Sequence, residues 1–171
     1  MGRRGRLVPD YVFAGYSSVT SQFLKNHGIT LLLCDLDNTL LDKGHSVPMG
    51  GMMKWQESLA AVGIKIFIVS NNRHEKRVAR FAHALHTGYI FNAGKPSRKY
   101  IQFAIQMGHV PLSQVALMGD RLLTDVLGAK RCGIMSIMVE PIRGSTGVGY
   151  RLLRLLQEPY KRQSRDYRYL S

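Results

Sequence analysis

The sequence predicts an α/β domain in which helices cover both faces of a mostly parallel sheet of five strands. Short apolar runs alternate along the chain with segments of helical periodicity, which is typical of βαβ units. The apolar runs lack an alternating polar face, as expected for strands that are buried on both sides. The chain has 171 residues, which is enough for one domain with a sizeable core.

Five short apolar runs are the predicted strands. They are Ile29–Cys34, Ile64–Val69, Tyr89–Phe91, Val115–Met118 and Ile134–Val139. Each run ends before a segment with helical spacing of its apolar residues begins. This order places a helix after most of the strands, as parallel neighbours require.

Four segments between or after these strands predict helices, over residues 49–62, 73–86, 98–107 and 124–131. Residues that suit helix starts precede them, namely Pro48, Asn72, Ser97 and Thr124. Glycines that suit helix ends follow three of them, namely Gly63, Gly108 and Gly133. The start and stop signals therefore agree with the apolar periodicity.

The two ends of the chain depart from this pattern. Residues 7–16 predict an irregular entry, followed by a helix over 19–27. Residues 141–149 are rich in glycine and predict a flexible linker, after which a helix over 150–158 ends at Pro159. The resulting division is an N-terminal extension packed on the core (1–28), the core (29–142), and a linker with a basic C-terminal segment (143–171).

Net charge is the unusual property of the composition. The chain has 24 Lys and Arg against 11 Asp and Glu, a formal net charge of +13. A basic balance predicts affinity for nucleic acid, an anionic membrane or a phosphorylated substrate, although a solvated basic surface explains it equally well. Cys34 and Cys132 make no disulfide framework, and no apolar run is long enough to span a bilayer. We expect an unlipidated protein of the cytoplasm.

Two acidic residues directly follow the first of the five strands. They are Asp35 and Asp37, in the run Cys34-Asp-Leu-Asp-Asn-Thr-Leu40. Ligands of open α/β sheets bind beyond the carboxyl ends of the strands. Two nearby carboxylates repel each other and need a cation or a shared proton, and hard oxygen ligands select Mg²⁺. Alone, such a pair is more often part of a polar loop.

Three further polar segments follow the next strands. Ser70-Asn71-Asn72 follows the second strand, Lys95-Pro96 follows the third, and the run from Gly119 to Asp125 follows the fourth. A hydroxyl and a helix N-terminus at such a place can bind phosphate. Four consecutive strands thus deliver an acid pair, a hydroxyl, a lysine and a second acid pair to one sheet edge. This combination predicts a functional site.

These motifs resemble the haloacid dehalogenase-like (HAD) superfamily of phosphatases. The forms D-L-D-N-T-L, S-N-N, A-G-K-P and G-D-R-L-L-T-D are similar to the YqeG-type members of its subclass III A, and the likeness covers about residues 7–142. It implies the three-layer Rossmann-like HAD fold and a Mg²⁺-dependent phosphoric monoester hydrolase with an aspartyl-phosphate intermediate. Eukaryotic relatives of this branch include a mitochondrial phosphatidylglycerophosphate phosphatase.

The resemblance also implies roles for individual residues. Asp35 matches the nucleophile, and Asp37 matches the general acid and base, whose backbone carbonyl also binds the metal. The implied phosphate-binding residues are Thr39, Ser70, Asn71 and Lys95. The implied metal ligands are Asp35, Asp37, Asp120 and the supporting acid Asp125. Cys34 stands where an apolar residue is usual, and we interpret it as a small buried hydrophobic residue.

The site is expected to be open. Members of the superfamily often select substrates through cap domains inserted after the first motif or between the second and third. Only eleven residues separate Asp37 from Met49, and twenty-four separate Ser70 from Lys95. Neither interval can hold a cap domain, which suits a large or surface-borne phosphate ester, although a partner subunit could cover the site.

The substrate class stays open at this level. The resemblance favours phosphatidylglycerophosphate. The alternatives are a phosphatase of nucleotide or nucleic-acid phosphates, and an RNA- or ribosome-associated binding protein with residual hydrolase activity. Pure binding of a polyanion does not require four acids at one sheet edge, so we prefer an enzyme.

Two basic segments each have two interpretations. Arg73, Lys76, Arg77 and Arg80 lie at helical spacing, either as a solvated face or as a rim that attracts a polyanionic substrate. Residues 150–171 carry six basic and two acidic residues, net +4. This segment is expected to aid peripheral attachment to an anionic membrane and to contribute little to the chemistry, unless its leucines pack back onto the domain.

Overall fold

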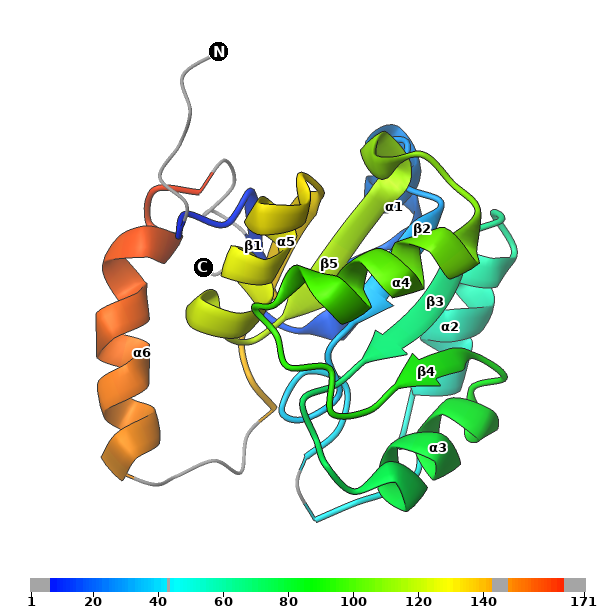
Figure 1. The fold of residues 1–171 in the computed structure, drawn as a ribbon, viewed down its shortest axis with the longest axis horizontal. Coiled ribbons are helices and arrows are strands. Elements are labelled where there is room, and N and C mark those ends of the chain that lie inside the picture. Colours follow the sequence, from blue (N-terminus) through cyan, green and yellow to red (C-terminus); the bar gives the residue numbers. More distant parts are fainter. Residues whose placement is uncertain (1–6, 43, 143–147, 165–171) are drawn as a thin grey trace.

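The structure, a computed structural model, describes residues 7–42, 44–142 and 148–164. Six parallel strands form one sheet in the order β1-β6-β5-β2-β3-β4 (Figure 1). Their bounds are β1 Tyr11–Phe13, β2 Leu31–Cys34, β3 Lys65–Val69, β4 Gly88–Ile90, β5 Val115–Gly119 and β6 Met135–Val139. The predicted parallel α/β architecture is confirmed.

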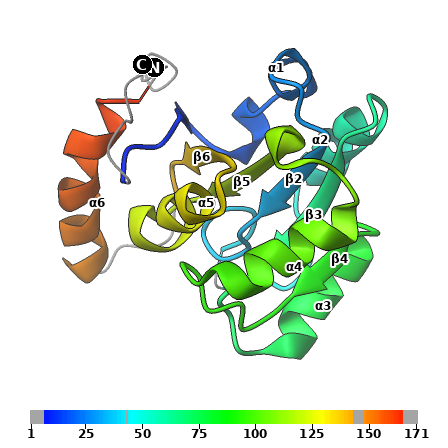
Figure 2. The same ribbon diagram turned by 45° about the horizontal axis from the view of Figure 1, so that its top comes forward.

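The sheet is covered on both faces by helices (Figures 1 and 2). The helices are α1 Ser21–Asn26, α2 Met52–Ala60, α3 Glu75–Ala84, α4 Arg98–Gly108, α5 Leu127–Cys132 and α6 Val148–Lys161. Apolar residues of α1, α2 and α3 pack in one core cluster with Leu32 and Cys34 of β2. Residues of α4 and α5 pack in a second cluster with Leu31 and Leu33. Successive side chains of β2 therefore point into the two core clusters in turn, which explains why both faces of the strand are apolar.

The sixth strand, β1, is a difference from the expected five. It lies within the segment expected to be irregular, and it pairs in parallel with β6, with Tyr11 opposite Ile137. The backbone N–H of Asp10 donates to the carbonyl of Ser136 at 3.1 Å, which extends the pairing by one residue. A run of three residues is too short for its period to stand out in the sequence. The N-terminal segment is thus part of the sheet.

Several helix boundaries differ from the prediction for local reasons. The helix α2 begins at Met52 and not at Met49, because Gly50 has a φ of +56° and breaks the first turn. The helix α3 begins at Glu75, because the Asn72 side chain accepts the N–H of His74 at 2.8 Å and so turns the chain before the helix. Residues Leu122–Val126 form a π-helical turn ahead of α5, where a Thr124-capped helix was expected.

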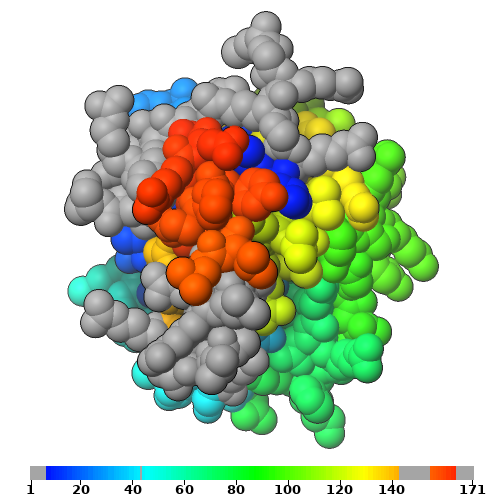
Figure 3. All heavy atoms as spheres, turned by 90° about the vertical axis from the view of Figure 1, so that its left-hand side faces the viewer, coloured from blue at the N-terminus to red at the C-terminus, as the bar shows by residue number. Residues whose placement is uncertain are grey.

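The helix α6 is longer than predicted. It runs through Pro159 to Lys161, whereas Pro159 was expected to end it. Its side chains Gln157 and Lys161 are buried, and Tyr160 packs on a cluster that includes Val12 and Leu122. Figure 3 shows this part of α6 lying against the N-terminal segment.

Most of the predicted linker and the end of the chain lie outside the described residues, as do the side chains of Arg151, Leu152, Leu153 and Arg154. The alternative that Leu152 and Leu153 pack on the domain therefore stays a prediction, whereas Leu156, the third leucine of that alternative, is exposed. Within the described part of the chain, each helix is too short or too polar to cross a bilayer.

Candidate active site

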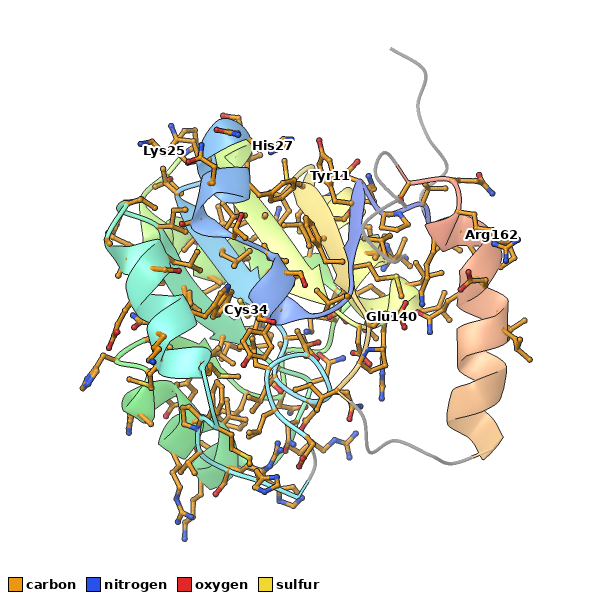
Figure 4. The ribbon with its side chains drawn as sticks, turned by 180° about the vertical axis from the view of Figure 1, so that it is seen from behind. Tyr11, Lys25, His27, Cys34, Glu140 and Arg162 are labelled. Atoms are coloured by element: carbon orange, nitrogen blue, oxygen red, sulfur yellow. The ribbon has the colours of Figure 1, made fainter. Side chains whose placement is uncertain are left out.

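The polar segments that follow β2, β3, β4 and β5 meet in one cavity of about 210 Å³. It is lined by Asp35, Asp37, Asn71, Asn72, Lys95, Arg121 and Thr124. The strands run in parallel, so their carboxyl ends share one edge of the sheet, as the sequence predicted. Figure 4 marks this edge through Cys34, the last residue of β2.

Asp35 is the most enclosed carboxylate that lines the cavity. Its backbone N–H donates to the carbonyl of Met118 at 2.8 Å, which continues the sheet pairing and fixes the main chain. Its Oδ1 pairs with Lys95 Nζ at 2.7 Å, and its Oδ2 lies 3.4 Å from the hydroxyl of Thr39. Burial raises the pKa of Asp35 to about 6, against the effect of Lys95 and with help from Asp125. Among the described residues, the Thr39 hydroxyl is the one hydrogen-bond donor to Oδ2.

Lys95 joins two carboxylates with one buried ammonium group. Its Nζ lies 2.7 Å from Asp35 Oδ1 and 2.7 Å from Asp125 Oδ1, and the residue is 4% exposed. Burial would lower the pKa of Lys95, but Asp125 and Asp35 together hold it above its usual range. The ammonium is therefore charged at neutral pH and available for a third, anionic partner in the cavity.

Asn71 holds the backbone of Lys95. Its Oδ1 accepts the N–H of Lys95 at 2.8 Å, and its Nδ2 donates to the carbonyl of Lys95 at 3.0 Å. Both ends of this amide are thus engaged, so Asn71 positions the lysine although it lines the cavity. Ser70 and Thr39 are buried and are not among the residues that line it. The Ser70 hydroxyl oxygen accepts the N–H of Asn72 at 3.1 Å.

Three carboxylates form a group that suits a metal ion. One oxygen from each of Asp35, Asp120 and Asp125 lies within 4.8 Å of the others. Both oxygens of Asp120 are buried and accept no hydrogen bond from any described residue, and the nearest cation, Arg121 Nε, is 4.0 Å from Oδ2. Burial, and then Asp35 and Asp125, raise the pKa of Asp120 to about 8. Buried carboxylate oxygens without partners need a cation, and hard oxygen ligands fit Mg²⁺.

The loop that carries this acid group is shaped by Gly119 and by backbone contacts. A Cβ at Gly119 would lie 2.2 Å from the carboxyl carbon of Asp125, so only glycine fits there. Asp125 Oδ2 accepts the N–H of Arg121 and the hydroxyl of Thr124, both at 3.2 Å. These contacts point the remaining oxygen of Asp125 toward Lys95.

Asp37 has a different set of partners from Asp35. Arg77 Nη1 pairs with its Oδ1 at 2.5 Å, and Asn72 Nδ2 donates to its Oδ2 at 2.8 Å. Its carboxylate is not part of the three-acid group. The sequence assigned Asn72 to a helix cap and left Arg77 between a solvated face and a rim. The only sequence signals for these two contacts were the pair of adjacent asparagines and the helical spacing of the basic residues after them.

The helix α6 reaches the acid loop, which the sequence did not indicate. The buried Gln157 accepts the N–H of Leu122 at 3.2 Å through its Oε1. The buried Lys161 forms an ion pair with the partly exposed Glu140, which follows β6 and faces α6 in Figure 4. Leu155 and Leu156 are exposed on the outer side. The C-terminal helix therefore contacts the loop that carries Asp120 and Asp125.

Comparison with known proteins agrees with this geometry. The HAD-hydrolase-like family matches residues 92–148. The probable phosphatase YqeG of Bacillus subtilis is 34% identical over 152 residues, which cover 88% of this chain and 87% of that protein.

Solved structures show the same fold at low identity. A haloacid dehalogenase-like hydrolase from Brucella suis has a TM-score of 0.53 at 14% identity, covering 74% of this chain and 93% of that one. The cobalt-bound deoxy-D-mannose-octulosonate 8-phosphate phosphatase of Haemophilus influenzae has a TM-score of 0.50 at 14% identity, covering 81% and 90%.

Proposed function

The chain belongs to the haloacid dehalogenase-like phosphatases of the YqeG type, and from this premise we propose that it is a Mg²⁺-dependent phosphomonoesterase with Asp35 as nucleophile. The observation that carries the proposal is the buried group in which Lys95 bridges Asp35 and Asp125, beside a carboxylate of Asp120 that accepts no hydrogen bond from any residue the structure describes. Such a cavity suits a cation at the three acids and an anionic phosphoryl group at Lys95.

In the first half-reaction, an Asp35 oxygen attacks phosphorus and the bond from phosphorus to the ester oxygen breaks. The Lys95 ammonium stabilises the charge on the equatorial oxygens. The protonated form of Asp37 gives its proton to the leaving oxygen and becomes a carboxylate, and the product alcohol departs. In the second half-reaction, Asp37 takes a proton from water, which attacks the aspartyl-phosphate and releases phosphate and Asp35.

Three acids would hold the metal ion, namely Asp35, Asp120 and Asp125, with the backbone carbonyl of Asp37 as implied by the resemblance. Bound Mg²⁺ supplies charge neutralisation between the nucleophile and the phosphoryl oxygens. Thr39 and Ser70 keep the phosphate-binding roles that the resemblance implies, whereas the contacts of Asn71 favour a supporting role for it.

The proposed substrate is a large, surface-borne phosphate ester, with phosphatidylglycerophosphate as the first candidate. The cavity is small and has no cap domain over it within the described residues. Exposed apolar side chains occur in the segments that follow two of the strands behind the cavity, Val47 and Met49 after β2 and Leu123 in the turn after β5. With the exposed Lys76 of α3 and with Arg121, they suit peripheral contact with an anionic membrane facing the cytoplasm.

A substrate panel tests this proposal. Wild-type protein would be given p-nitrophenyl phosphate, phosphatidylglycerophosphate in vesicles, nucleotides and a 5′-phosphorylated RNA, each with Mg²⁺ or EDTA. We expect Mg²⁺-dependent turnover that is fastest with the phospholipid, and none in Asp35→Asn. Faster turnover of nucleotides or RNA would move the substrate to the nucleic-acid class. RNA binding without turnover would favour the binding protein, and full activity in EDTA would exclude the metal.

A further inference from the structure

Arg77 uses its guanidinium group to join Asp37 to the loop that contains Asp42 and His45. Its Nη1 pairs with Asp37 Oδ1 at 2.5 Å, its Nη2 donates to the carbonyl of Asp42 at 2.8 Å, and its Nε donates to the carbonyl of His45 at 3.0 Å. The side chains of Arg77 and Asp37 are 17% and 22% exposed. A guanidinium engaged on all three nitrogens is fixed in place and is not a free cation for a substrate.

The neighbouring arginine makes a useful contrast. Arg80 lies one turn further along α3, and its Nη1 reaches the hydroxyl of Ser46 at 3.4 Å, at the same loop. Both arginines therefore tie the loop residues Asp42, His45 and Ser46 to α3, but only Arg77 of the two also contacts Asp37. A role in holding the loop would be shared by both, whereas a role in holding Asp37 belongs to Arg77.

The contacts of Asp37 explain why such a role is needed. Asp37 lies beyond the end of β2, where its backbone makes an isolated β-bridge with Leu41, and the next residue, Asn38, has a φ of +64°. Its side chain is therefore held by its own polar contacts. Asn72 Nδ2 holds one oxygen at 2.8 Å and Arg77 holds the other. A carboxylate gripped at both oxygens cannot rotate freely about its last bond, and misplacement of a reacting group by about 1 Å can cost 10²-fold in rate.

We propose that Arg77 is a positioning residue that holds the Asp37 carboxylate at the leaving-group side of the phosphoryl site. The proposal rests on the proposed function, because it assigns Asp37 the proton transfer to the ester oxygen. An alkyl ester oxygen needs that proton when its bond to phosphorus breaks. p-Nitrophenolate is a good leaving group and departs without it.

The test compares Arg77→Gln with Arg80→Gln on two substrates. For glycerol phosphate, we expect kcat/KM to fall about 10–100-fold in Arg77→Gln and to stay near wild type in Arg80→Gln. For p-nitrophenyl phosphate, we expect the pre-steady-state burst of p-nitrophenolate to slow less than about threefold in both variants. If Arg77→Gln slows the reaction equally on both substrates, or if the two variants are slowed equally, Arg77 has a structural role and the assignment as a positioning residue for Asp37 is overturned.

A double-mutant cycle closes the test. In an Asp37→Asn background, Arg77→Gln should cost less than about threefold on glycerol phosphate, since residues that act through one another are not additive. Additive losses would overturn the proposal. If Arg77→Gln does not fold, Arg77→Lys is used, because lysine keeps the charge but loses the several fixed donors of the guanidinium group. Its losses on glycerol phosphate and on p-nitrophenyl phosphate are then compared in the same way. Wild-type protein without any phosphatase turnover would overturn the proposed function, whereas wild-type turnover with an unaffected Arg77→Gln would overturn this inference alone.

Discussion

Asp120→Asn should stabilise the metal-free protein at alkaline pH while removing its activity. Burial, then Asp35 and Asp125, raise the pKa of Asp120 from its ordinary 3.8 to about 8. Between these values the folded chain keeps a proton that the unfolded chain releases, so the free energy of unfolding falls as pH rises. At about 1.4 kcal/mol per pKa unit, the loss over the whole interval is about 6 kcal/mol, of which about 4 kcal/mol falls between pH 5 and pH 8. An asparagine carries no such titration.

Urea unfolding at pH 5 and pH 8 in EDTA would measure this difference. Wild-type protein should lose stability between the two pH values and Asp120→Asn should lose much less, so the variant is the more stable one at pH 8. Mg²⁺ binds ionised carboxylates, so it should restore wild-type stability at pH 8 and have little effect on the variant. An Asp120→Asn protein that is less stable than wild type at pH 8 in EDTA would refute the reasoning.

Asp10 provides a matched control of opposite sign. Burial acts to raise the pKa of Asp10, but hydrogen bonds from Lys130 and Ser136 lower this pKa overall. Lys130 Nζ pairs with its Oδ1 at 2.5 Å. A lowered pKa contributes stability above the unfolded value, and this stability is lost as pH falls. Asp10→Asn should therefore be less stable than wild type at pH 8, with or without Mg²⁺.

Three further substitutions test individual roles. Asp35→Asn should abolish turnover and leave the circular dichroism spectrum unchanged, because an amide is a poor nucleophile; normal turnover would remove Asp35 from that role. Asp37→Asn should slow turnover about 10²–10⁴-fold, and a loss below about tenfold would contradict its acid–base role. Gln157→Ala should raise the Mg²⁺ concentration for half-maximal thermal stabilisation about tenfold, because Gln157 holds Leu122 N–H beside the acids. Leu156→Ala, at an exposed position of the same helix, should leave this Mg²⁺ concentration unchanged. Equal shifts in the two variants would argue against a role for the hydrogen bond between Gln157 and Leu122.

The central fold was predictable because burial on both faces leaves a plain sequence signal. The central strands β2 and β5 are apolar at every position, and the glycine at position 133 ends α5 with a φ of +72°. The strand β1 was missed because its three residues depend on pairing with β6, which lies more than a hundred residues away in the chain. The turn at Leu122–Val126 was missed because tertiary contacts outweigh local cap preference there.

The candidate site was predictable only as far as local motifs reach. Asp35, Lys95 and Asp120 each follow a strand, so the parallel sheet dictates that they meet. Arg77 lies 40 residues from Asp37 in the chain, and Gln157 lies 35 residues from Leu122. Neither pair belongs to a local pattern, so their contacts depend on packing that the sequence alone does not reveal.

Trapping the covalent intermediate tests the central claim most directly. The protein would be mixed with p-nitrophenyl phosphate and Mg²⁺, quenched in acid, digested and mapped by mass spectrometry. The account predicts one phosphoryl group on the peptide that carries Asp35, with a larger yield in Asp37→Asn because water attack is slowed, and none in Asp35→Asn or in EDTA. Turnover without any phosphorylated peptide, or a phosphoryl group on a different residue, would contradict it.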